Sequence, residues 1–242
     1  MPPPGNQRER FVQQIFDGIA GRYDFLNRVI SFHLDTVWRR KAVNSLDLAG
    51  KTMSVLDLGT GTGDLAFTAA SRIGDGGRVV GLDFAPEMLR LAAAKRMDHI
   101  GGHKALFVLG SALAAPFKSD SFEAVMTGFV LRNVSDLNLF FIEAYRLLKP
   151  GGRLAALDMF PPAKGLFSMV YSLYFYRLVP WIGAGLARHG GAYRYLSESV
   201  KGFTAPEGIA ELIGNAGFQG VRIEKFLRGA VCLHIAQKPH ES

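Results

Sequence analysis

Residues 55–64 read Val-Leu-Asp-Leu-Gly-Thr-Gly-Thr-Gly-Asp, a short apolar run followed by three alternating glycines and an acid. Glycine lets a backbone turn tightly after a strand and lets a ligand approach the chain closely. The dinucleotide fingerprint instead spaces its glycines as Gly-x-Gly-x-x-Gly and seats a pyrophosphate on the following helix. Here Asp64 stands where that pyrophosphate would bind, and Asp57 adds a second carboxylate beside the loop. The pattern therefore favours a cationic ligand, such as a sulfonium that also carries an amino group.

A further acid follows at the distance expected of a nucleoside site. Asp83 ends the apolar run over residues 78–82, and an acid about 20 residues after such a loop accepts hydrogen bonds from the ribose hydroxyls. A glycine loop alone is also found in an ordinary turn whose acid caps a helix. Together, the loop and Asp83 predict a site for a nucleoside that bears a positive charge.

Outward from this loop, short apolar runs alternate with helical patterns along most of the chain. Strands are expected at 55–58, 78–83, 105–109, 122–126 and 153–158, and helices from Leu65, over 87–95 and over 137–148. Strands that alternate with helices of this length predict an α/β fold with a parallel sheet covered on both faces. A helix over 206–215 and strands near 221–226 and 230–236 close the chain. Its first 50 residues are expected to form a helical cap.

The composition is that of a globular protein. The 242 residues are 48% apolar and carry 28 basic and 21 acidic side chains, for a net charge of +7. This apolar content excludes a disordered chain. The single cysteine, Cys232, permits no intramolecular disulfide and predicts a reducing compartment such as the cytoplasm. No unbroken apolar run reaches the roughly 18 to 20 residues that span a bilayer, and no cluster of residues has metal-ligand spacing, so we expect no metal.

The order of these motifs resembles that of the class I S-adenosylmethionine-dependent methyltransferases. The resemblance implies a Rossmann-like, seven-stranded, mainly parallel sheet whose last strand is antiparallel. It implies a single methyltransferase domain over 1–242, with a helical cap (1–50), a cofactor-binding core (51–160), an apolar insert (161–203) and a closing helix and strands (204–242). In that family the cofactor, which leaves as S-adenosylhomocysteine, is held at the positions that correspond here to Asp57, Gly59, Gly61, Thr62, Asp83, Ser111, Ala112 and Gly128.

Several segments outside the cofactor core look like the ubiquinone/menaquinone biosynthesis C-methyltransferase family. They read Tyr-Asp-Phe-Leu-Asn-Arg at 23–28, Leu-Arg-Asn-Val at 131–134 and Ala-Tyr-Arg-Tyr-Leu at 192–196. The resemblance implies methylation of a ring carbon of a polyprenyl quinol, such as demethylmenaquinol or a ubiquinol precursor. The chain departs from the family pattern mainly on the acceptor side, at His33, Val130, Asp158, Met159 and His189.

Quinol methylation suggests roles for four side chains. A ring carbon becomes nucleophilic when the neighbouring hydroxyl loses its proton, so the site must stabilise a phenolate and hold the carbon in line with the methyl group. Arg132 suits the oxyanion, and Asn133 suits the orientation of a ring oxygen. Because Arg132 stays protonated, His33 or Tyr193 is expected to remove the proton. Each of these residues also has a purely structural interpretation: a cap histidine, an ion-paired arginine and a packing tyrosine.

The aromatic-rich segment 165–187 is expected to close over the apolar tail of the acceptor. It also predicts peripheral contact with the inner face of the membrane, because Tyr and Trp combine a large apolar area with a polar tip. The same segment could instead form a buried helix or the interface of a homodimer.

Three different functions share parts of this pattern. Nucleic acid base methyltransferases share the fold, but those that act on exocyclic amines carry Asn or Asp with Pro-Pro-aromatic where residues 127–130 read Thr-Gly-Phe-Val. No nucleic acid partner is therefore expected. A methyltransferase that acts on a different lipophilic small molecule or on a phospholipid amine stays open, as does a noncatalytic cofactor-binding paralogue.

Overall fold

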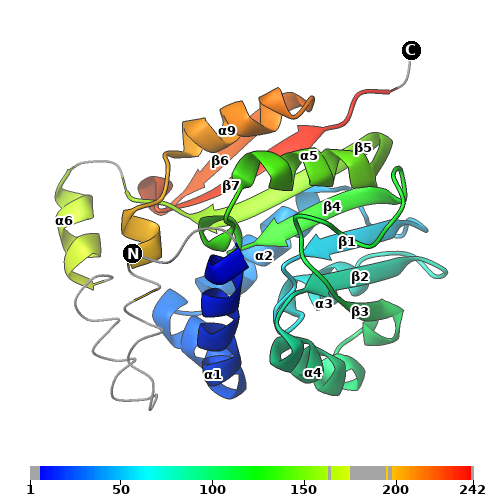
Figure 1. Cartoon of the computed structure of the whole chain (residues 1–242), viewed down its shortest axis with the longest axis horizontal. Helices are drawn as coiled ribbons and strands as arrows, with labels where there is room; N and C mark the ends of the chain where they lie inside the picture. The colour runs from blue at the N-terminus through cyan, green and yellow to red at the C-terminus, as the bar shows by residue number, and fades with distance from the viewer. Residues whose placement is uncertain (1–5, 163–164, 175–194, 196–197, 241–242) are drawn as a thin grey trace.

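A seven-stranded sheet forms the centre of the computed structural model, which describes residues 6–162, 165–174, 195 and 198–240 (Figure 1). In spatial order the strands are β3 (Ala105–Leu109), β2 (Arg78–Asp83), β1 (Ser54–Leu58), β4 (Phe122–Gly128), β5 (Leu148–Met159), β7 (Val231–Gln237) and β6 (Gln219–Phe226). The strands β1 to β5 pair in parallel, whereas β7 is antiparallel to both of its neighbours. The predicted fold class and the antiparallel last strand are confirmed.

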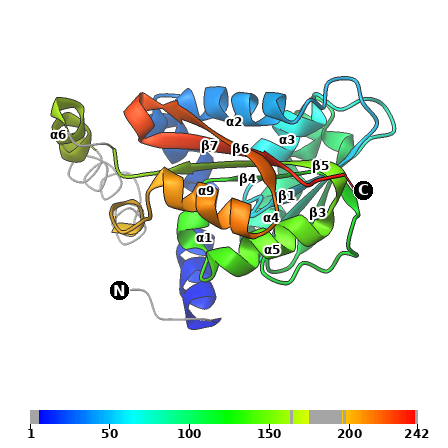
Figure 2. The ribbon, with the colours of Figure 1, turned by 90° about the horizontal axis from the view of Figure 1, so that it is seen from above.

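Seven α-helices are described around this sheet. They are α1 (Asn6–Ser31), α2 (Leu34–Ser45), α3 (Asp64–Ala70), α4 (Pro86–Lys95), α5 (Leu137–Leu147), α6 (Leu166–Leu173) and α9 (Pro206–Asn215). Figure 2 shows α2 and α3 on one face of the sheet and α5 and α9 on the other. The division of the chain into cap, core and insert stays a prediction, because much of the insert lies outside the described residues.

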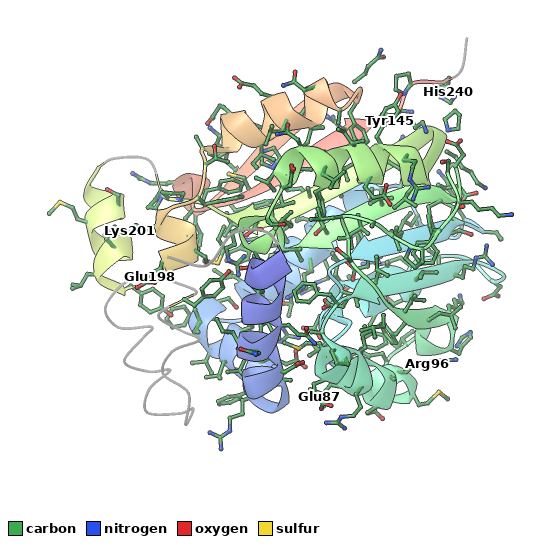
Figure 3. The ribbon with its side chains drawn as sticks, viewed as in Figure 1. Glu87, Arg96, Tyr145, Glu198, Lys201 and His240 are labelled. Carbon is green, nitrogen blue, oxygen red and sulfur yellow. The ribbon has the colours of Figure 1, made fainter. Side chains whose placement is uncertain are left out.

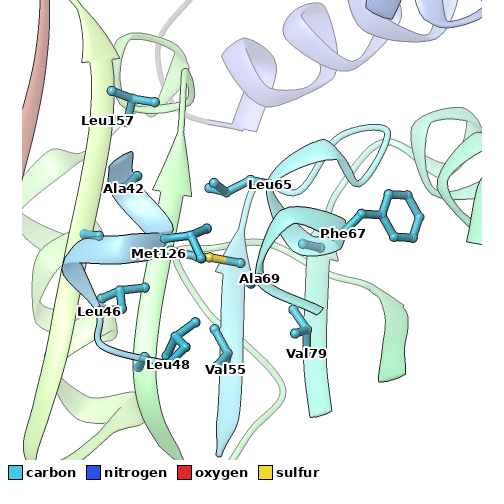
Figure 4. Close-up of a cluster of buried hydrophobic side chains, with 14 of the residues drawn as sticks. Ala42, Leu46, Leu48, Val55, Leu65, Phe67, Ala69, Val79, Met126 and Leu157 are labelled. Carbon is cyan, nitrogen blue, oxygen red and sulfur yellow. The ribbon is translucent and has the colours of Figure 1, made fainter. Parts of the chain in front are cut away.

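Successive side chains of the central strands enter two different hydrophobic cores. Val55, Met126 and Leu157 pack against α2 and α3 in the first core (Figure 4). Their neighbours Leu56 and Val125 point to the opposite face and pack against α5 and α9. Because both faces are covered, the central strands are apolar throughout rather than alternating. This is why short continuous apolar runs marked the strands in the sequence.

The helical cap consists of α1 and α2, which meet at a sharp corner. Phe32 and His33 form the corner with φ values of 51° and 63°, a left-handed conformation that non-glycine residues seldom adopt. The backbone N–H of His33 donates to the carbonyl of Arg28 (2.8 Å), and the Thr36 hydroxyl donates to the carbonyl of His33 (2.8 Å). These bonds hold the corner in the absence of a glycine.

Several charged side chains lie at the periphery of the molecule, such as Glu87 and Arg96 at one end (Figure 3). Among the described helices, none combines the length and apolar character needed to cross a membrane. Within the same residues, no group of His, Cys, Asp and Glu is arranged to hold a metal ion.

Candidate active site

The glycine loop folds back over the end of β2. Gly59, Gly61 and Gly63 all have positive φ values, of 74°, 55° and 87°. The backbone N–H groups of Gly59 and Thr60 donate to the carbonyl of Leu82, at 2.8 and 3.0 Å. A Cβ atom on Gly63 would lie 2.8 Å from the ring of Phe67, so this position requires glycine for both its conformation and its space.

A pocket of about 550 Å³ opens beside this loop, at the carboxyl ends of β1, β2 and β4. It is lined by residues 59–62, Asp64, Asp83, Phe84, Met88, residues 128–130, Asn133, Arg39, and Val12, Phe16 and Tyr23 of α1. A second pocket of about 400 Å³ shares part of this lining and extends to Ser111 and Ala112. The neighbouring strands β1 and β4 mark the point where strand order reverses, which is the usual ligand site of such sheets.

Asp83 lies in the wall of both pockets and ties two backbone segments together. Its Oδ2 accepts a hydrogen bond from the N–H of Gly61 (2.7 Å), and its Oδ1 accepts one from Ala85 (2.9 Å). Burial raises the pKa of the Asp83 carboxyl, and the negative charge of Asp17 on α1 adds to this. The residue is thus placed at the loop and aimed at the pocket, as a ribose-binding acid must be.

Asp57 lies beneath the glycine loop, with 1% of its surface exposed. Its Oδ2 accepts a hydrogen bond from the Thr60 hydroxyl (2.7 Å), while its buried Oδ1 has no hydrogen-bond partner among the described residues. Burial raises the pKa of Asp57 to about 7. A buried carboxylate oxygen without a donor is costly, and a cationic ligand group above the loop would reduce that cost.

Asp64 is compensated by cations. Burial alone would raise the pKa of Asp64, but the nearby cations Arg39, Lys95 and Arg28 hold it below its usual range. Arg28 of α1 lies 2.9 Å from this carboxylate and Lys95 lies 3.2 Å from it. Asp64 therefore offers a ligand less net negative charge than the sequence suggests.

Two contacts of Asp24 also bind α1 to the site. The Thr62 hydroxyl donates to Asp24 Oδ1 (2.5 Å), and Lys95 donates to Asp24 Oδ2 (2.6 Å). With the pair between Arg28 and Asp64, they form a set of polar contacts that we call the α1 clasp. The clasp holds α1 against the glycine loop and α4.

The turn Leu131–Asn133 follows β4 and brings one of the two predicted acceptor-binding residues to the pocket. Asn133 lines both pockets, and its Oδ1 accepts a hydrogen bond from the hydroxyl of buried Tyr195 (3.2 Å). Arg132 has 5% of its surface exposed. Its Nη1 donates to Asp158 Oδ1 (2.5 Å) and to the carbonyl of Phe129 (3.0 Å).

Of the two predicted general bases, only His33 lies among the described residues, and it does not line the described pockets. His33 is exposed at the corner between α1 and α2, and the described pocket lining does not include it. Tyr193 lies outside the described residues. Of the predicted cofactor-binding residues, Gly59, Gly61, Thr62, Asp83 and Gly128 line the first pocket, and Ser111 and Ala112 line the second.

The model of the ubiE/COQ5 methyltransferase family matches residues 5–238. The chain belongs to this family. The chain is 45% identical to the demethylmenaquinone methyltransferase of Thermus thermophilus over 93% of this chain and all of that protein. It is 43% identical to the demethylmenaquinone methyltransferase of Deinococcus radiodurans over 90% of each chain. The predicted family is confirmed.

The fold of this ubiE/COQ5 methyltransferase family member also occurs in more distant solved structures. A SAM-dependent methyltransferase from Aquifex aeolicus superposes with a TM-score of 0.62 at 18% identity, covering 85% of this chain and 92% of that one. The prediction of an S-adenosylmethionine-dependent methyltransferase is confirmed by the family and the fold. The pocket fits this cofactor, because Asp83 in its wall suits a ribose. The unpartnered oxygen of Asp57 lies beneath the glycine loop, outside the described pocket lining, and suits an ammonium group bound above that loop.

Three parts of this family member's site did not emerge from the sequence. They are Arg39, Tyr195, and the side chains Val12, Phe16 and Tyr23 with which α1 covers the pocket. A signal was present for the first two. Arg39 directly follows Trp38, and Tyr195 lies in the same Tyr-Arg-Tyr-Leu element as the favoured Tyr193. The fold places Arg39 in the pocket wall and Tyr195 at Asn133.

Proposed function

We propose that the chain transfers a methyl group from S-adenosylmethionine to a ring carbon of demethylmenaquinol or a closely related prenyl quinol. The observation that carries this proposal is Asn133, a pocket-lining amide just beyond β4 whose carbonyl is bound by Tyr195. The names of the curated relatives from Thermus and Deinococcus support the acceptor class. The reaction forms a bond between carbon and carbon, breaks the bond between the methyl group and sulfur, and releases the ring hydrogen as a proton.

In this proposal the cofactor supplies an electrophilic methyl group, and the chain supplies its orientation. Asp83 accepts hydrogen bonds from the ribose, and the residues around Ser111 flank the adenine. Gly59 and Gly61 would allow close approach of the methionine part, and Asp57 would compensate its ammonium group from beneath the loop. Held by these residues, the cofactor would supply its methyl group beside the turn after β4, which ends in Asn133.

Asn133 acts on the acceptor through its amide nitrogen. Because its Oδ1 already accepts a hydrogen bond from Tyr195, its Nδ2 group is the donor available to a ring oxygen. A preoriented donor stabilises the negative charge that develops on a phenolate without reorganising during the reaction. Tyr195 is a positioning residue in this scheme, since it fixes which side of the amide faces the pocket.

Arg132 contributes by holding the same turn. Its guanidinium is bound to Asp158 on β5 and to the carbonyl of Phe129, so the turn is fixed to the end of the sheet. The sequence predicted direct contact of Arg132 with the oxyanion. The buried ion pair favours an indirect role instead, in which Arg132 positions Asn133.

The apolar tail of the acceptor finds a suitable surface between the cap and α6. Phe32 is 72% exposed, and Met169 and Leu173 of α6 are 70% and 61% exposed. The ring of Tyr174 stacks on Phe32 at a centroid distance of 5.6 Å, and its hydroxyl donates to the carbonyl of Ile30 (2.8 Å). This apolar surface is our basis for the proposal that the protein touches the membrane. Residues 175–187 of the predicted lid lie outside the described residues.

A methyl-transfer assay tests the proposal. Labelled S-adenosylmethionine is offered with a short-tailed demethylmenaquinol, a ubiquinol precursor, phosphatidylethanolamine or transfer RNA. We expect label in a quinol alone. Label in the lipid amine or the RNA, or cofactor binding with no label in either quinol, contradicts the assigned acceptor.

Two variants then test the site. Asn133→Ala is expected to lower kcat by about 100- to 1,000-fold, the usual effect of losing an oxyanion donor, and to leave cofactor affinity unchanged. Tyr195→Phe removes the hydrogen bond to the Asn133 amide and is expected to have a smaller effect on kcat. Unchanged kcat in Asn133→Ala would exclude the amide from the chemistry.

A further inference from the structure

Arg39 lies in the pocket wall and has no role in the scheme above. Its surface is 7% exposed, and it is the one cationic side chain among the described residues that line the first pocket. Its Nε atom is buried and has no hydrogen-bond partner in the described part of the chain. The nearest carboxylate oxygen, Asp35 Oδ2, is 3.6 Å from it, which is too far for a hydrogen bond.

Asp35 is moreover largely engaged by other residues. Its Oδ1 accepts a hydrogen bond from the Ser31 hydroxyl (2.8 Å), and its Oδ2 is bound by Arg28. Arg39 therefore interacts with this carboxylate at a distance and forms no hydrogen bond to it through Nε. A buried guanidinium whose Nε makes no hydrogen bond lowers the stability of the fold. An anion in the pocket would complete its hydrogen bonding.

The position of Arg39 in the pocket indicates which anion it would bind. Its Nη1 lies 3.6 Å from the point where a Cβ atom on Gly128 would be, so the guanidinium faces the end of β4. Arg39 also interacts electrostatically with Asp57 and Asp64 at the glycine loop. This is the opposite end of the site from Ser111 and Ala112, which line the second pocket with Asp83. Arg39 is thus at the end where the methionine part of the cofactor belongs.

We propose that Arg39 binds the α-carboxylate of S-adenosylmethionine, opposite the carboxylates that receive its ammonium group. An amino acid presents one cation and one anion on the same carbon, and this end of the pocket offers acids together with one arginine. A planar guanidinium matches a carboxylate through two parallel hydrogen bonds, which a lysine does not reproduce. The inference rests on the proposed function, since it requires this cofactor as the ligand.

Calorimetry with two ligands tests the proposal on the unmodified protein. The first ligand is S-adenosylhomocysteine, and the second is its decarboxylated analogue, which keeps the amino group, the thioether and the nucleoside. We expect the analogue to bind about 10- to 100-fold more weakly, the range for charge-assisted hydrogen bonds. Equal affinities overturn the proposal without any variant. Failure to bind either ligand contradicts the proposed function itself.

Variants then assign the difference to Arg39. In Arg39→Gln, which keeps a hydrogen-bond donor near Asp35, we expect the two ligands to bind with nearly equal affinity. Arg39→Lys should restore only part of the discrimination. The matched control is Arg40→Gln, because Arg40 is the exposed neighbour whose Nε donates to the carbonyl of Thr36 (3.3 Å), and it should keep the full discrimination.

Two outcomes would overturn the assignment. If Arg39→Gln still prefers S-adenosylhomocysteine as strongly as the parent does, another group binds the carboxylate. If this variant keeps both affinities but loses turnover with the quinol, Arg39 serves the acceptor oxyanion instead. Thermal melting of each variant with and without ligand shows whether weaker binding reflects the site or an unfolded protein.

Discussion

The guanidinium of Arg132 lies 2.5 Å from the carboxylate of Asp158, and the two side chains are 4% and 0% exposed. The pair joins the turn after β4 to the adjacent strand β5 beneath the site. A buried ion pair adds little to folding stability compared with apolar residues of similar volume. Removing one partner of such a pair is nevertheless strongly destabilising, because a charge is left in the interior without that partner. The pair therefore makes the geometry of the turn depend on Asp158, a residue that does not line the described pockets.

Asp158→Asn should lower the free energy of unfolding by about 3 to 5 kcal/mol, because it removes the negative charge that binds the buried Arg132 guanidinium. Urea unfolding measures this change. The control is Asp47→Asn, which removes an exposed pair with Lys51 and should change the stability by less than about 1 kcal/mol. Similar losses in the two variants would contradict a special role for the buried pair.

Asp83→Ala should weaken the binding of S-adenosylhomocysteine by about 10- to 100-fold, equivalent to about 1.5 to 3 kcal/mol for a charge-assisted hydrogen bond. Calorimetry gives the affinity, and Asp75→Ala serves as the control, because Asp75 is fully exposed and distant in the fold from the described pocket lining. Unchanged affinity in Asp83→Ala would remove Asp83 from the cofactor site.

Binding should depend on pH through Asp57, whose pKa is raised by burial to about 7. Below this pH the free protein holds Asp57 protonated, and an ammonium ligand must displace the proton. The affinity for S-adenosylhomocysteine should then fall by up to about tenfold per pH unit below 7 and level off above it. Asp57→Asn should lack this dependence, and a parent protein with pH-independent affinity between 5 and 7 would refute the role.

The same raised pKa predicts a change in folding stability with the opposite trend. An unfolded Asp titrates near 3.8, so between that pH and about 7 the folded state holds a proton that the unfolded state has lost. The contribution of Asp57 to stability is therefore fully present below pH 3.8 and is lost as the pH rises through 7. The difference in unfolding free energy between the parent and Asp57→Asn, followed over pH 4 to 8, isolates this effect.

Gly59→Ala should be destabilising for two separable reasons. Its Cβ would lie 2.5 Å from Cγ2 of Val130, and its φ of +74° is unfavourable for alanine. Adding Val130→Gly should relieve the clash, so that Gly59→Ala, measured relative to Val130→Gly alone, retains only the conformational cost of about 1 to 2 kcal/mol. Gly61→Ala is the matched control, because its φ is +55° and no atom lies within 4 Å of the added carbon. Urea unfolding of these variants tests the separation.

The sheet and its helices were predictable because each is encoded locally. The apolar runs at β1 to β5 and the glycine loop each specify an element by their own pattern, and parallel pairing then brings their carboxyl ends together. Strand β5 begins earlier than expected, at Leu148 instead of Arg153. Leu148 pairs with Phe122 before an irregularity in the register, and the Pro150-Gly151-Gly152 run at that irregularity favoured a turn ahead of the strand.

The side-chain partners in the site were less predictable because they depend on residues distant in the sequence. Arg132 was expected at the acceptor, but it meets Asp158, 26 residues away. The sequence favoured Tyr193, which lies outside the described residues. Tyr195 is the tyrosine whose hydroxyl binds Asn133. The corner at Phe32 and His33 contains no glycine or proline, so local rules gave no reason to end α1 there.

The α1 clasp is expected to make the rate of ligand exchange depend on ion pairs. Val12, Phe16 and Tyr23 cover the pocket, and the contacts of Asp24 and Arg28 fix their helix to the glycine loop and Lys95. Because Val12, Phe16 and Tyr23 line the pocket, we expect release of the product to require that these ion pairs loosen. Dissolved ions weaken such partly exposed pairs. The dissociation rate of S-adenosylhomocysteine, followed by stopped flow, should therefore increase with salt concentration. The turnover rate of the enzyme would then depend partly on the ionic strength of its surroundings.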